Sequence, residues 1–399
     1  MDSTLQSIFA KGFGNYVHGK TLPPHFYKAA NQIIKCRTAA LGGHIGQCVE
    51  GHIDGVWYNS CKHRFCPQCN EIQKERWLEK QKARLLDTPH HHIIFTLPHE
   101  LEGLWLRNTS VMMNLLFHAV RDTLMRLLDS EPERRFLDAL PGFLCAFHSW
   151  GRSLPWHPHL HCLITDGGLS RSGHWRQPKG SCFIPVRIVR DVFKGKYLAV
   201  LKAALAHGEL RLPDAHTLQQ INNLCNKLGR VKWNVRICER YDHAHGVATY
   251  MARYIRGGAL KNTQLLKVTE ETVTFCYTPH KDKAGKRYDK MTLPISKFIQ
   301  RYLVHVPEPG VQTVRGYGLY SNAKLAHLNQ ARNELGQTAV KYPEFLDWGS
   351  YMIKINPDWS PPVCKVCGEL ITYHTSVPRA TGPPFAHRVS QGSVLSPGT

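Results

Sequence analysis

The sequence lacks the features that would place a protein in a membrane or direct it to secretion. It has no run of about 18 or more apolar residues, the length that a membrane-spanning helix needs. Met1–Lys20 shows no signal-peptide pattern, so we expect no membrane association. Acidic residues are scarce too, since 30 Asp and Glu stand against 51 Lys and Arg, leaving a formal charge of +21. That excess favours a polyanionic partner, nucleic acid before an anionic membrane.

Disulfide bonds are not expected either, although cysteine is plentiful. The 13 cysteines are an odd number, and several lie in C-x-x-C-like clusters among histidines. In a chain without a secretory signal, that pattern indicates metal ligation in a reducing, cytosolic compartment. With 399 residues, 42% of them hydrophobic, the chain can bury a core in two or three domains, or in one large domain with small appendages.

The character of the sequence changes along the chain and predicts four regions. Residues 1–88 are rich in Cys, His and Gly, as expected for a zinc-binding, DNA-binding domain held by metal rather than by a large core. Residues 89–335 alternate strand-like and helix-like segments, which predicts an α+β domain whose antiparallel sheet is covered by helices. Residues 336–374 form a small region around a C-x-x-C motif. Residues 375–399, rich in Pro, Gly and Ser, are expected to be disordered.

Apolar periodicity places the main elements of these regions. A charged segment, Glu71–Asp87, has helical spacing and leads out of the first region. The predicted strands are Ile93–Leu97, Phe143–Trp150, His157–Thr165, Val231–Arg240 and Thr272–Tyr277. The predicted amphipathic helices are Val111–Leu128, Val192–Ala206 and Ala215–Leu228.

A dense group of soft ligands near the amino terminus predicts structural Zn²⁺. Its candidate ligands are Cys36, His44, Cys48, His52, Cys61, Cys66 and Cys69. Zinc takes four N or S ligands in a tetrahedron, and C-x-x-C spacing lets two thiolates of one turn share an ion. Cys66 with Cys69 has this spacing, and Cys48 with His52 forms a plausible second pair. The other three complete a second site or belong to the core, and buried free thiols are the alternative for the whole group.

Two further features extend the zinc hypothesis. Lys62 and Arg64 lie inside the cysteine cluster and are candidates for DNA contact. Near the carboxyl end, Cys364 and Cys367 resemble half of a zinc ribbon that needs two more ligands, for which His374 and His387 are nearby. A free thiol pair on a turn explains the same motif equally well.

The segment His157-Pro-His159-Leu-His161 is the candidate metal site for catalysis. Alternate residues of a strand face the same side, so the three imidazoles share one face, while Leu160, Cys162 and Ile164 point into a core. Such imidazoles can chelate a divalent ion, Mg²⁺ or Mn²⁺, that acts as a Lewis acid on a phosphate. A His-rich surface strand or hydrogen-bonded core histidines would give the same pattern.

Tyr250 and Tyr254 are spaced i, i+4 before Gly257-Gly258, so both hydroxyls leave one face of a predicted helix. A tyrosine that attacks a DNA phosphate forms a 5′-phosphotyrosine and keeps the bond energy for rejoining. Arg253 and Arg256 would bind the DNA and stabilise charge. Ordinary helix packing is the alternative for such a pair.

In this order and spacing, the motifs resemble those of the rolling-circle, two-tyrosine HUH transposases of bacterial insertion sequences, which carry an amino-terminal zinc-binding domain. The matching segments are Cys36–His44, Asn59–Cys61, Cys66–Cys69, Phe95–Leu101, His157–His161, Tyr250–Tyr254, Phe298–Tyr302 and Arg315–Tyr320. One departure is Cys48-Val-Glu-Gly-His52, which has no second cysteine where relatives have C-x-x-C-G, so either His52 replaces it or the zinc site is altered.

The resemblance implies an HUH-endonuclease sheet with the histidine strand at its centre and the tyrosine helix beside it. It implies that His159 and His161 bind the catalytic metal and that Tyr250 and Tyr254 are the nucleophiles. The third metal ligand stays open among His157, His243 and His245.

From this resemblance we expect a bacterial, nucleoid-associated transposase that acts on single-stranded DNA at the ends of its element and on target DNA. A homo-oligomer is compatible with the sequence. Two rival functions use the same motifs: a plasmid replication initiator or relaxase, and a catalytically inactive zinc-dependent DNA-binding protein.

Overall fold

The computed structural model describes residues 3–69, 71–129, 136–178, 183–243, 246, 258–279 and 288–380. The chain forms two compact units, and each combines separate stretches of sequence. Unit 1 comprises residues 1–76, 256–306 and 344–399, and unit 2 comprises residues 77–255 and 307–343. The division expected from the sequence, at residues 88, 335 and 374, assumes contiguous domains, whereas both units are discontinuous.

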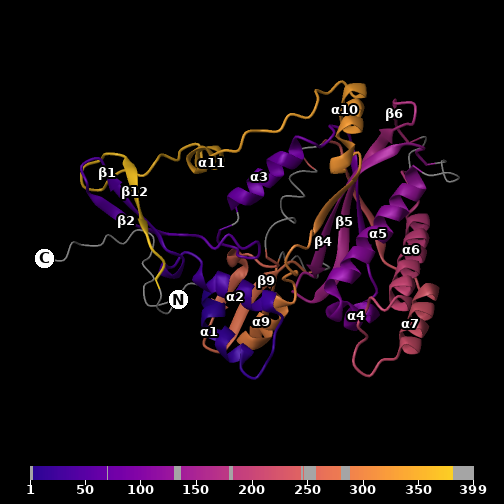
Figure 1. The fold of residues 1–399 in the computed structure, drawn as a ribbon, viewed down its shortest axis with the longest axis horizontal. Coiled ribbons are helices and arrows are strands. Elements are labelled where there is room, and N and C mark those ends of the chain that lie inside the picture. Colours follow the sequence, from indigo (N-terminus) through magenta and orange to yellow (C-terminus); the bar gives the residue numbers. More distant parts are fainter. Residues whose placement is uncertain are drawn as a thin grey trace. The chain divides into compact units, whose positions relative to one another are not determined.

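Unit 2 contains a six-stranded sheet in the order β11-β4-β5-β3-β7, with β6 paired to β5 (Figure 1). All of its strand pairs are antiparallel. Its strands are β3 (His90–Thr96), β4 (Leu140–Trp150), β5 (Trp156–Leu169), β6 (Trp175–Arg176), β7 (Val235–Tyr241) and β11 (Val314–Gly318). The α+β class with antiparallel sheets is therefore confirmed, and β5, which carries the histidine motif, lies at the centre.

The helices of unit 2 follow the amphipathic segments of the sequence. They are α4 (Glu102–Arg107), α5 (Thr109–Leu128), α6 (Val186–Ala206), α7 (Leu218–Arg230) and α10 (Leu325–Glu334). Helix α7 begins at Leu218 rather than at the predicted Ala215, because the Thr217 hydroxyl caps it and pairs with Gln220 in a capping box. None of the helices in the described part of the chain has the length and apolar character to span a bilayer.

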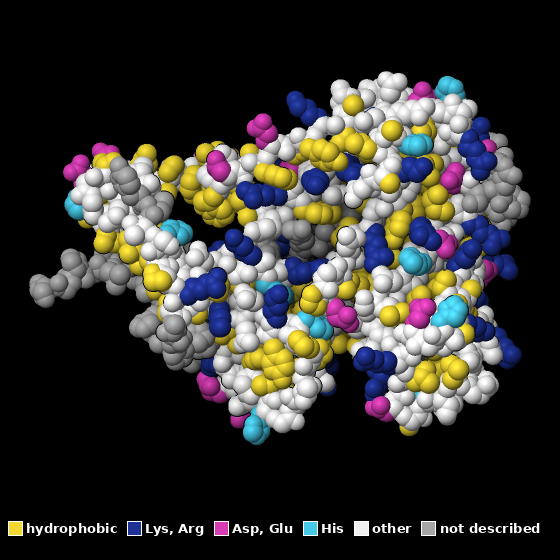
Figure 2. Space-filling model, viewed as in Figure 1, with side chains coloured by type: hydrophobic (Ala, Val, Ile, Leu, Met, Phe, Trp, Pro, Cys, Tyr) yellow, Lys and Arg dark blue, Asp and Glu magenta, His cyan; other side chains and the backbone are white. Residues whose placement is uncertain are grey.

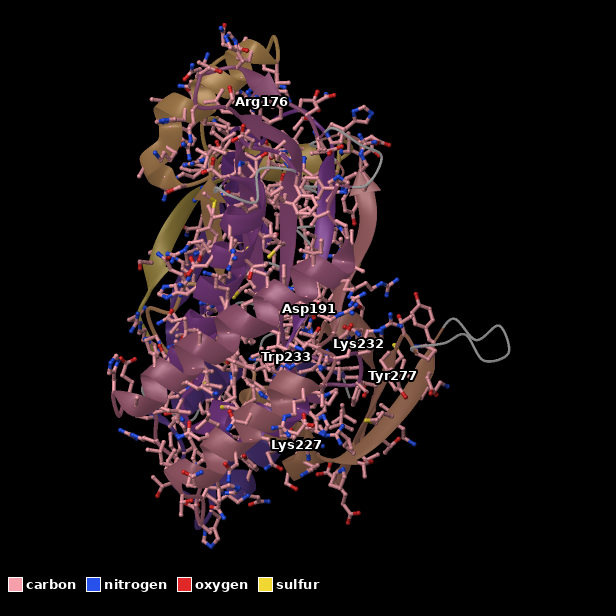
Figure 3. The ribbon with its side chains drawn as sticks, turned by 90° about the vertical axis from the view of Figure 1, so that its right-hand side faces the viewer. Arg176, Asp191, Lys227, Lys232, Trp233 and Tyr277 are labelled. Carbon is pink, nitrogen blue, oxygen red and sulfur yellow. The ribbon has the colours of Figure 1, made fainter. Side chains whose placement is uncertain are left out.

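The two faces of the central sheet bury different side chains. Leu160, Cys162 and Ile164 are fully buried in a large core with residues of α5 and α6, as the alternation of β5 predicts. Helices α6 and α7 lie side by side in Figure 3, where Asp191 marks α6 and Lys227 marks α7. The opposite face carries a smaller core that includes residues of α10. The histidines of β5 belong to this second face.

Unit 1 has a helical core of its own. Its elements are α1 (Leu5–Val17), α2 (Pro24–Lys35), β1 (Gly43–Cys48), β2 (Ile53–Tyr58), β8 (Leu265–Val268), β9 (Thr272–Tyr277), β10 (Asp289–Pro294), α9 (Ile295–Leu303), α11 (Trp348–Ile355) and β12 (Ile371–Val377). Helix α3 (Glu71–Lys82) crosses the boundary between the units.

The amino-terminal module is held by packing as well as by its cysteines, which corrects the expectation of a module without a large core. Helices α1, α2 and α9 pack together and bury Phe9, Ile33 and Phe298. A methyl group on Gly12 would meet the Ile295 side chain 2.0 Å away, so glycine permits the close approach of α1 to α9. Helix α9, far along the chain, supplies the apolar side chains that α1 and α2 need to form a core.

Two small antiparallel sheets complete unit 1. Strands β8, β9 and β10 form one, in the order β10-β9-β8, and β9 spans the predicted residues Thr272–Tyr277. The other has the order β12-β1-β2, so the last strand of the chain pairs with the first. Figure 1 shows this pairing as a yellow strand beside indigo and purple ones. Strand β12 extends to Val377, past residue 375, where disorder was expected to begin.

Candidate metal centres and active site

Four cysteines of unit 1 converge into one cluster. The sulfurs of Cys36, Cys61, Cys66 and Cys69 all lie within 4.8 Å of one another, and Cys61 Sγ is 3.6 Å from Cys69 Sγ. A tetrahedral zinc ion with Zn–S bonds of about 2.3 Å holds its sulfurs roughly 3.8 Å apart, so the spacing fits zinc. Hydrogen bonding within the cluster lowers the pKa of the Cys69 thiol, so a thiolate is favoured there.

Buried polar contacts hold this cluster in place. Gln6, on α1, donates from Nε2 to the carbonyl oxygens of Ile34, at 2.7 Å, and Cys36, at 2.8 Å. Tyr302, on α9, donates its hydroxyl to the carbonyl of Phe65, the residue before Cys66, at 2.5 Å. Tyr302 of the Phe298–Tyr302 motif therefore positions the loop that carries the C-x-x-C pair, although the two segments are far apart in the sequence.

Three histidines of unit 2 form the second cluster. Their ligand nitrogens, from His148, His159 and His161, lie within 4.8 Å of one another. Residue His148 of β4 is paired directly with His159 of β5, so both side chains emerge on the same face. The Nε2 atoms of His159 and His161 are 3.0 Å apart. Two ligands about 2.1 Å from one ion and at a right angle would have this separation, so the nitrogens fit a divalent metal.

Hydrogen bonds to the other ring nitrogens orient two of these imidazoles. His159 donates from Nδ1 to the carbonyl of His157 at 2.7 Å, which leaves Nε2 with its lone pair facing the cluster. His161 Nδ1 lies 2.9 Å from Nε2 of His92, a buried residue of β3 on the same face. A hydrogen bond at the far nitrogen is the usual support of a metal-binding histidine.

Burial keeps these rings neutral, the state in which imidazole binds metal. Desolvation lowers the pKa of His159 to about 4 and that of His92 to about 4, and it lowers the pKa of His161 well below its usual range. His148 is 2% exposed, at the edge of the same group. His159 and His161 therefore offer uncharged nitrogen ligands on the central strand, and His148 brings a third nitrogen from the neighbouring strand.

The structure brings some predicted ligands together and leaves others apart. His157 contributes its carbonyl rather than its ring to the histidine group, and the exposed His243 does not join it. His44 stacks on Trp57, with ring centroids 6.1 Å apart, and is in neither cysteine group. Cys48, His52, Cys364 and Cys367 gather at a third position.

Other predicted residues can be placed only in part. In the turn between the cysteines, Lys62 is exposed and Arg64 is half-buried. The tyrosine pair, Tyr250 and Tyr254, lies outside the described residues, and so do Arg253, Arg256, His245 and His387.

Sequence reasoning missed two residues of the histidine site, His148 and His92. A signal for the first was present, because His148 falls in the predicted strand Phe143–Trp150 and has the same parity as the small-core residues Leu144 and Ala146. What was missing was the register that sets β4 against β5. His92 stood in a run of three histidines that has no apolar alternation.

Comparisons with known proteins identify the family of the chain. Residues 142–327 match the family described as "Putative transposase", and residues 8–97 match the "Transposase zinc-binding domain" family. The chain is 34% identical over 309 residues to "Putative transposase y4qJ" of Sinorhizobium fredii, which covers 76% of each chain. It is 26% identical over 359 residues to the transposase for insertion sequence element IS801 of Pseudomonas savastanoi pv. phaseolicola, covering 88% of this chain and 83% of the relative. No solved structure matches the chain.

These matches define the chain as a transposase with an amino-terminal zinc-binding domain. The chain belongs to the IS91/IS801 family of insertion-sequence transposases.

Proposed function

We propose that this transposase nicks single-stranded DNA at the ends of its element through a 5′-phosphotyrosine and transfers the attached strand to a target. The observation that carries the proposal is the histidine cluster. Three imidazoles on adjacent strands, of which His148 and His159 are buried and His161 is half-buried, bring one ligand nitrogen each to within 4.8 Å of the others. A hydrogen bond between His159 and His161 alone would not need His148, whereas three ligand nitrogens within 4.8 Å of one another suit a divalent cation.

In this proposal His148, His159 and His161 hold a Mg²⁺ or Mn²⁺ ion. When bound, the ion supplies Lewis acidity that draws charge from the scissile phosphate. The hydrogen bonds of His159 to the His157 carbonyl and of His161 to His92 keep the rings turned toward that position. Because the strands are rigid, little reorganisation is needed during the reaction.

Tyr250 and Tyr254 are the proposed nucleophiles. The phenol oxygen of one tyrosine bonds to phosphorus and loses its proton, while the bond from phosphorus to the 3′ oxygen breaks and that oxygen takes up a proton. In the second transfer, a 3′-hydroxyl attacks the phosphotyrosine, re-forms a phosphodiester and returns a proton to tyrosine. One bond is exchanged for another at each step, so no ATP is consumed.

Positive charge supports the DNA contact. Lys and Arg side chains are spread over the surface shown in Figure 2, in keeping with the net charge of +21. We assign phosphate contacts to Arg253 and Arg256 beside the tyrosines and to Lys62 and Arg64 in the zinc module. Contacts of this kind make binding fall steeply with salt concentration.

The test is incubation of the purified chain with labelled single-stranded terminal DNA and Mn²⁺ or Mg²⁺, followed by a denaturing gel. Wild type should form a covalent adduct, and the Tyr250→Phe/Tyr254→Phe variant should form none. Tyr288→Phe is the matched control, because Tyr288 is exposed and outside the proposed site. An adduct that survives in the double variant, or none with wild type, would contradict the mechanism.

The same assay distinguishes the proposed transposase from a catalytically inactive zinc-dependent DNA-binding protein. A DNA-binding protein without catalysis predicts binding that survives loss of His159 and His161, with no cleavage by wild type. Both curated relatives described above are named as transposases, which disfavours a replication initiator or relaxase.

A further inference from the structure

The third group of candidate ligands, in unit 1, brings residues of the amino-terminal module together with residues of the carboxy-terminal region. Cys48 and His52 flank the turn between β1 and β2, while Cys364 and Cys367 precede β12. The match to the zinc-binding family ends at residue 97, so it does not include the second pair. We propose that these four residues bind one zinc ion, so that the amino-terminal zinc module is completed by the carboxy-terminal region.

The distances within the group fit a tetrahedral ion. Cys48 Sγ lies 3.5 Å from Cys367 Sγ and 3.5 Å from Nδ1 of His52. All four ligand atoms are within 4.8 Å of one another. Zinc bound to sulfur at about 2.3 Å and to nitrogen at about 2.0 Å would separate these ligands by roughly 3.5–3.8 Å. The set is three thiolates and one imidazole, a combination typical of structural zinc.

The two ligand-bearing turns have the same local design. In the first, Gly51 donates its N–H to the Cys48 carbonyl at 3.0 Å and has φ +79°. In the second, Gly368 donates to the Cys364 carbonyl at 2.9 Å and also has φ +79°. A residue with a side chain is strained at this φ, so glycine is the residue that lets both turns close tightly beside their ligands.

A backbone framework aligns the two turns. Strand β12 pairs antiparallel with β1 from Gly43↔Val377 to Cys48↔Ile371, which brings Cys48 next to the chain that follows Cys367. The N–H of Val366 points to Cys364 Sγ at 3.4 Å, a contact that favours the thiolate needed by zinc. The register of β12 on β1 therefore places the two ligand-bearing turns side by side.

Packing around the group is too small to hold it without a metal. The local core consists of Cys48, Cys364 and Ile371, with Trp57 packed against it. Val49 and Val366, at the tips of the two turns, are 56% and 73% exposed. A core of this size cannot offset the loss of chain entropy, which is why small modules of this kind rely on metal.

The group also supplies the two further ligands that the Cys364/Cys367 half of a zinc ribbon needs. Two further ligands were sought for Cys364 and Cys367 at His374 or His387, which are close in sequence. His374 lies on β12, where its backbone pairs with Gly46, and His387 is outside the described residues. The ligands adjacent in space, Cys48 and His52, come from the other end of the chain, and His52 occupies the position where a second cysteine was expected.

Zinc content of the full-length chain, purified under reducing conditions and measured by mass spectrometry, tests the site. All variants carry His159→Ala/His161→Ala, which removes the histidine site, so the parent chain should hold about two zinc ions, one of them in the four-cysteine cluster. Cys48→Ser and Cys364→Ser/Cys367→Ser should each hold about one. Their combination should also hold about one, because both remove the same ion. Cys276→Ser, which alters a half-buried cysteine outside the clusters, is the control and should keep both.

A second variant guards against simple misfolding. His52→Cys should retain both ions, and after Co²⁺ substitution it should show a stronger sulfur-to-cobalt absorption than the parent chain, because one more thiolate joins the ion. The proposal is overturned if Cys364→Ser/Cys367→Ser keeps both ions. It is also overturned if the combined variant loses a further ion, or if His52→Cys leaves the cobalt spectrum unchanged. Zinc counts do not depend on DNA cleavage, so this result is independent of the proposed function.

Discussion

Replacing His92 should weaken metal binding at the histidine site although the residue is not one of the proposed ligands. His92 Nε2 lies 2.9 Å from His161 Nδ1, and His92 is 4% exposed. With His161 bound to metal through Nε2, Nδ1 carries the ring proton and donates it to His92. His92→Ala removes this acceptor and leaves a buried N–H without its partner, which costs about 1–3 kcal/mol.

That cost sets the expected size of the effect. Loss of a supporting hydrogen bond lowers metal affinity by about 10–100-fold, or roughly 1.4–2.7 kcal/mol, which agrees with the penalty above. His92→Gln should recover part of the loss, because the Gln carbonyl can reach a similar position and accept the same proton. His99→Ala is the control, since the His99 side chain is 90% exposed.

Calorimetric titration of the zinc-loaded chain with Mn²⁺ measures the affinity directly. The order of dissociation constants should be wild type and His99→Ala lowest, His92→Gln intermediate and His92→Ala highest. The reasoning fails if His92→Ala binds Mn²⁺ within about twofold of wild type while keeping its unfolding midpoint. It fails as well if His92→Gln binds as weakly as His92→Ala.

Three further predictions follow from other contacts. His148→Ala should abolish adduct formation at Mn²⁺ concentrations that saturate wild type, and excess Mn²⁺ should restore part of it; full activity would exclude His148 as a ligand. Tyr302→Phe removes the buried hydrogen bond to the Phe65 carbonyl and should lower the free energy of unfolding by about 1–3 kcal/mol. It should also speed the loss of zinc to a chelator, and an unchanged rate of zinc loss would show that Tyr302 does not support the cysteine cluster. Burial lowers the pKa of His90 to about 4, and its ring accepts a hydrogen bond from the Tyr320 hydroxyl, so His90 stays neutral in the fold. The unfolded chain therefore binds more protons than the folded chain between pH 6.5 and 4, and acidification across this range should lower the free energy of unfolding of wild type by up to about 3 kcal/mol more than that of His90→Gln. Equal losses in urea unfolding would contradict this prediction.

The sequence predicted the elements whose apolar pattern is local. Strand β9 and the end of α5 at Leu128 agree with the alternation and helical spacing of their residues. The inward side chains of β5 were predicted for the same reason, because the two-residue period of a strand fixes which residues share a face. Strand β3 was predicted to begin at Ile93 rather than His90, since three consecutive histidines lack a strand-like pattern.

Contacts between residues far apart in the sequence could not be predicted from local patterns. His148 meets His159 only through the register of β4 against β5, which depends on the packing of the whole sheet. Cys48 meets Cys367 across 319 positions because β12 returns to β1. Likewise, the core of the amino-terminal module depends on α9, whose distant position in the sequence made the module look too poor in apolar residues. Local patterns specify elements, whereas these sites depend on which elements become neighbours.

The most direct test of the central claim is to identify the residue that carries the DNA. The covalent adduct formed with terminal single-stranded DNA would be digested with protease and nuclease and its peptides sequenced by mass spectrometry. The proposed mechanism predicts a nucleotide linked through a 5′ phosphate to Tyr250 or Tyr254, absent when His159 and His161 are replaced. A nucleotide attached to any other residue, or an adduct that forms without those two histidines, would contradict it.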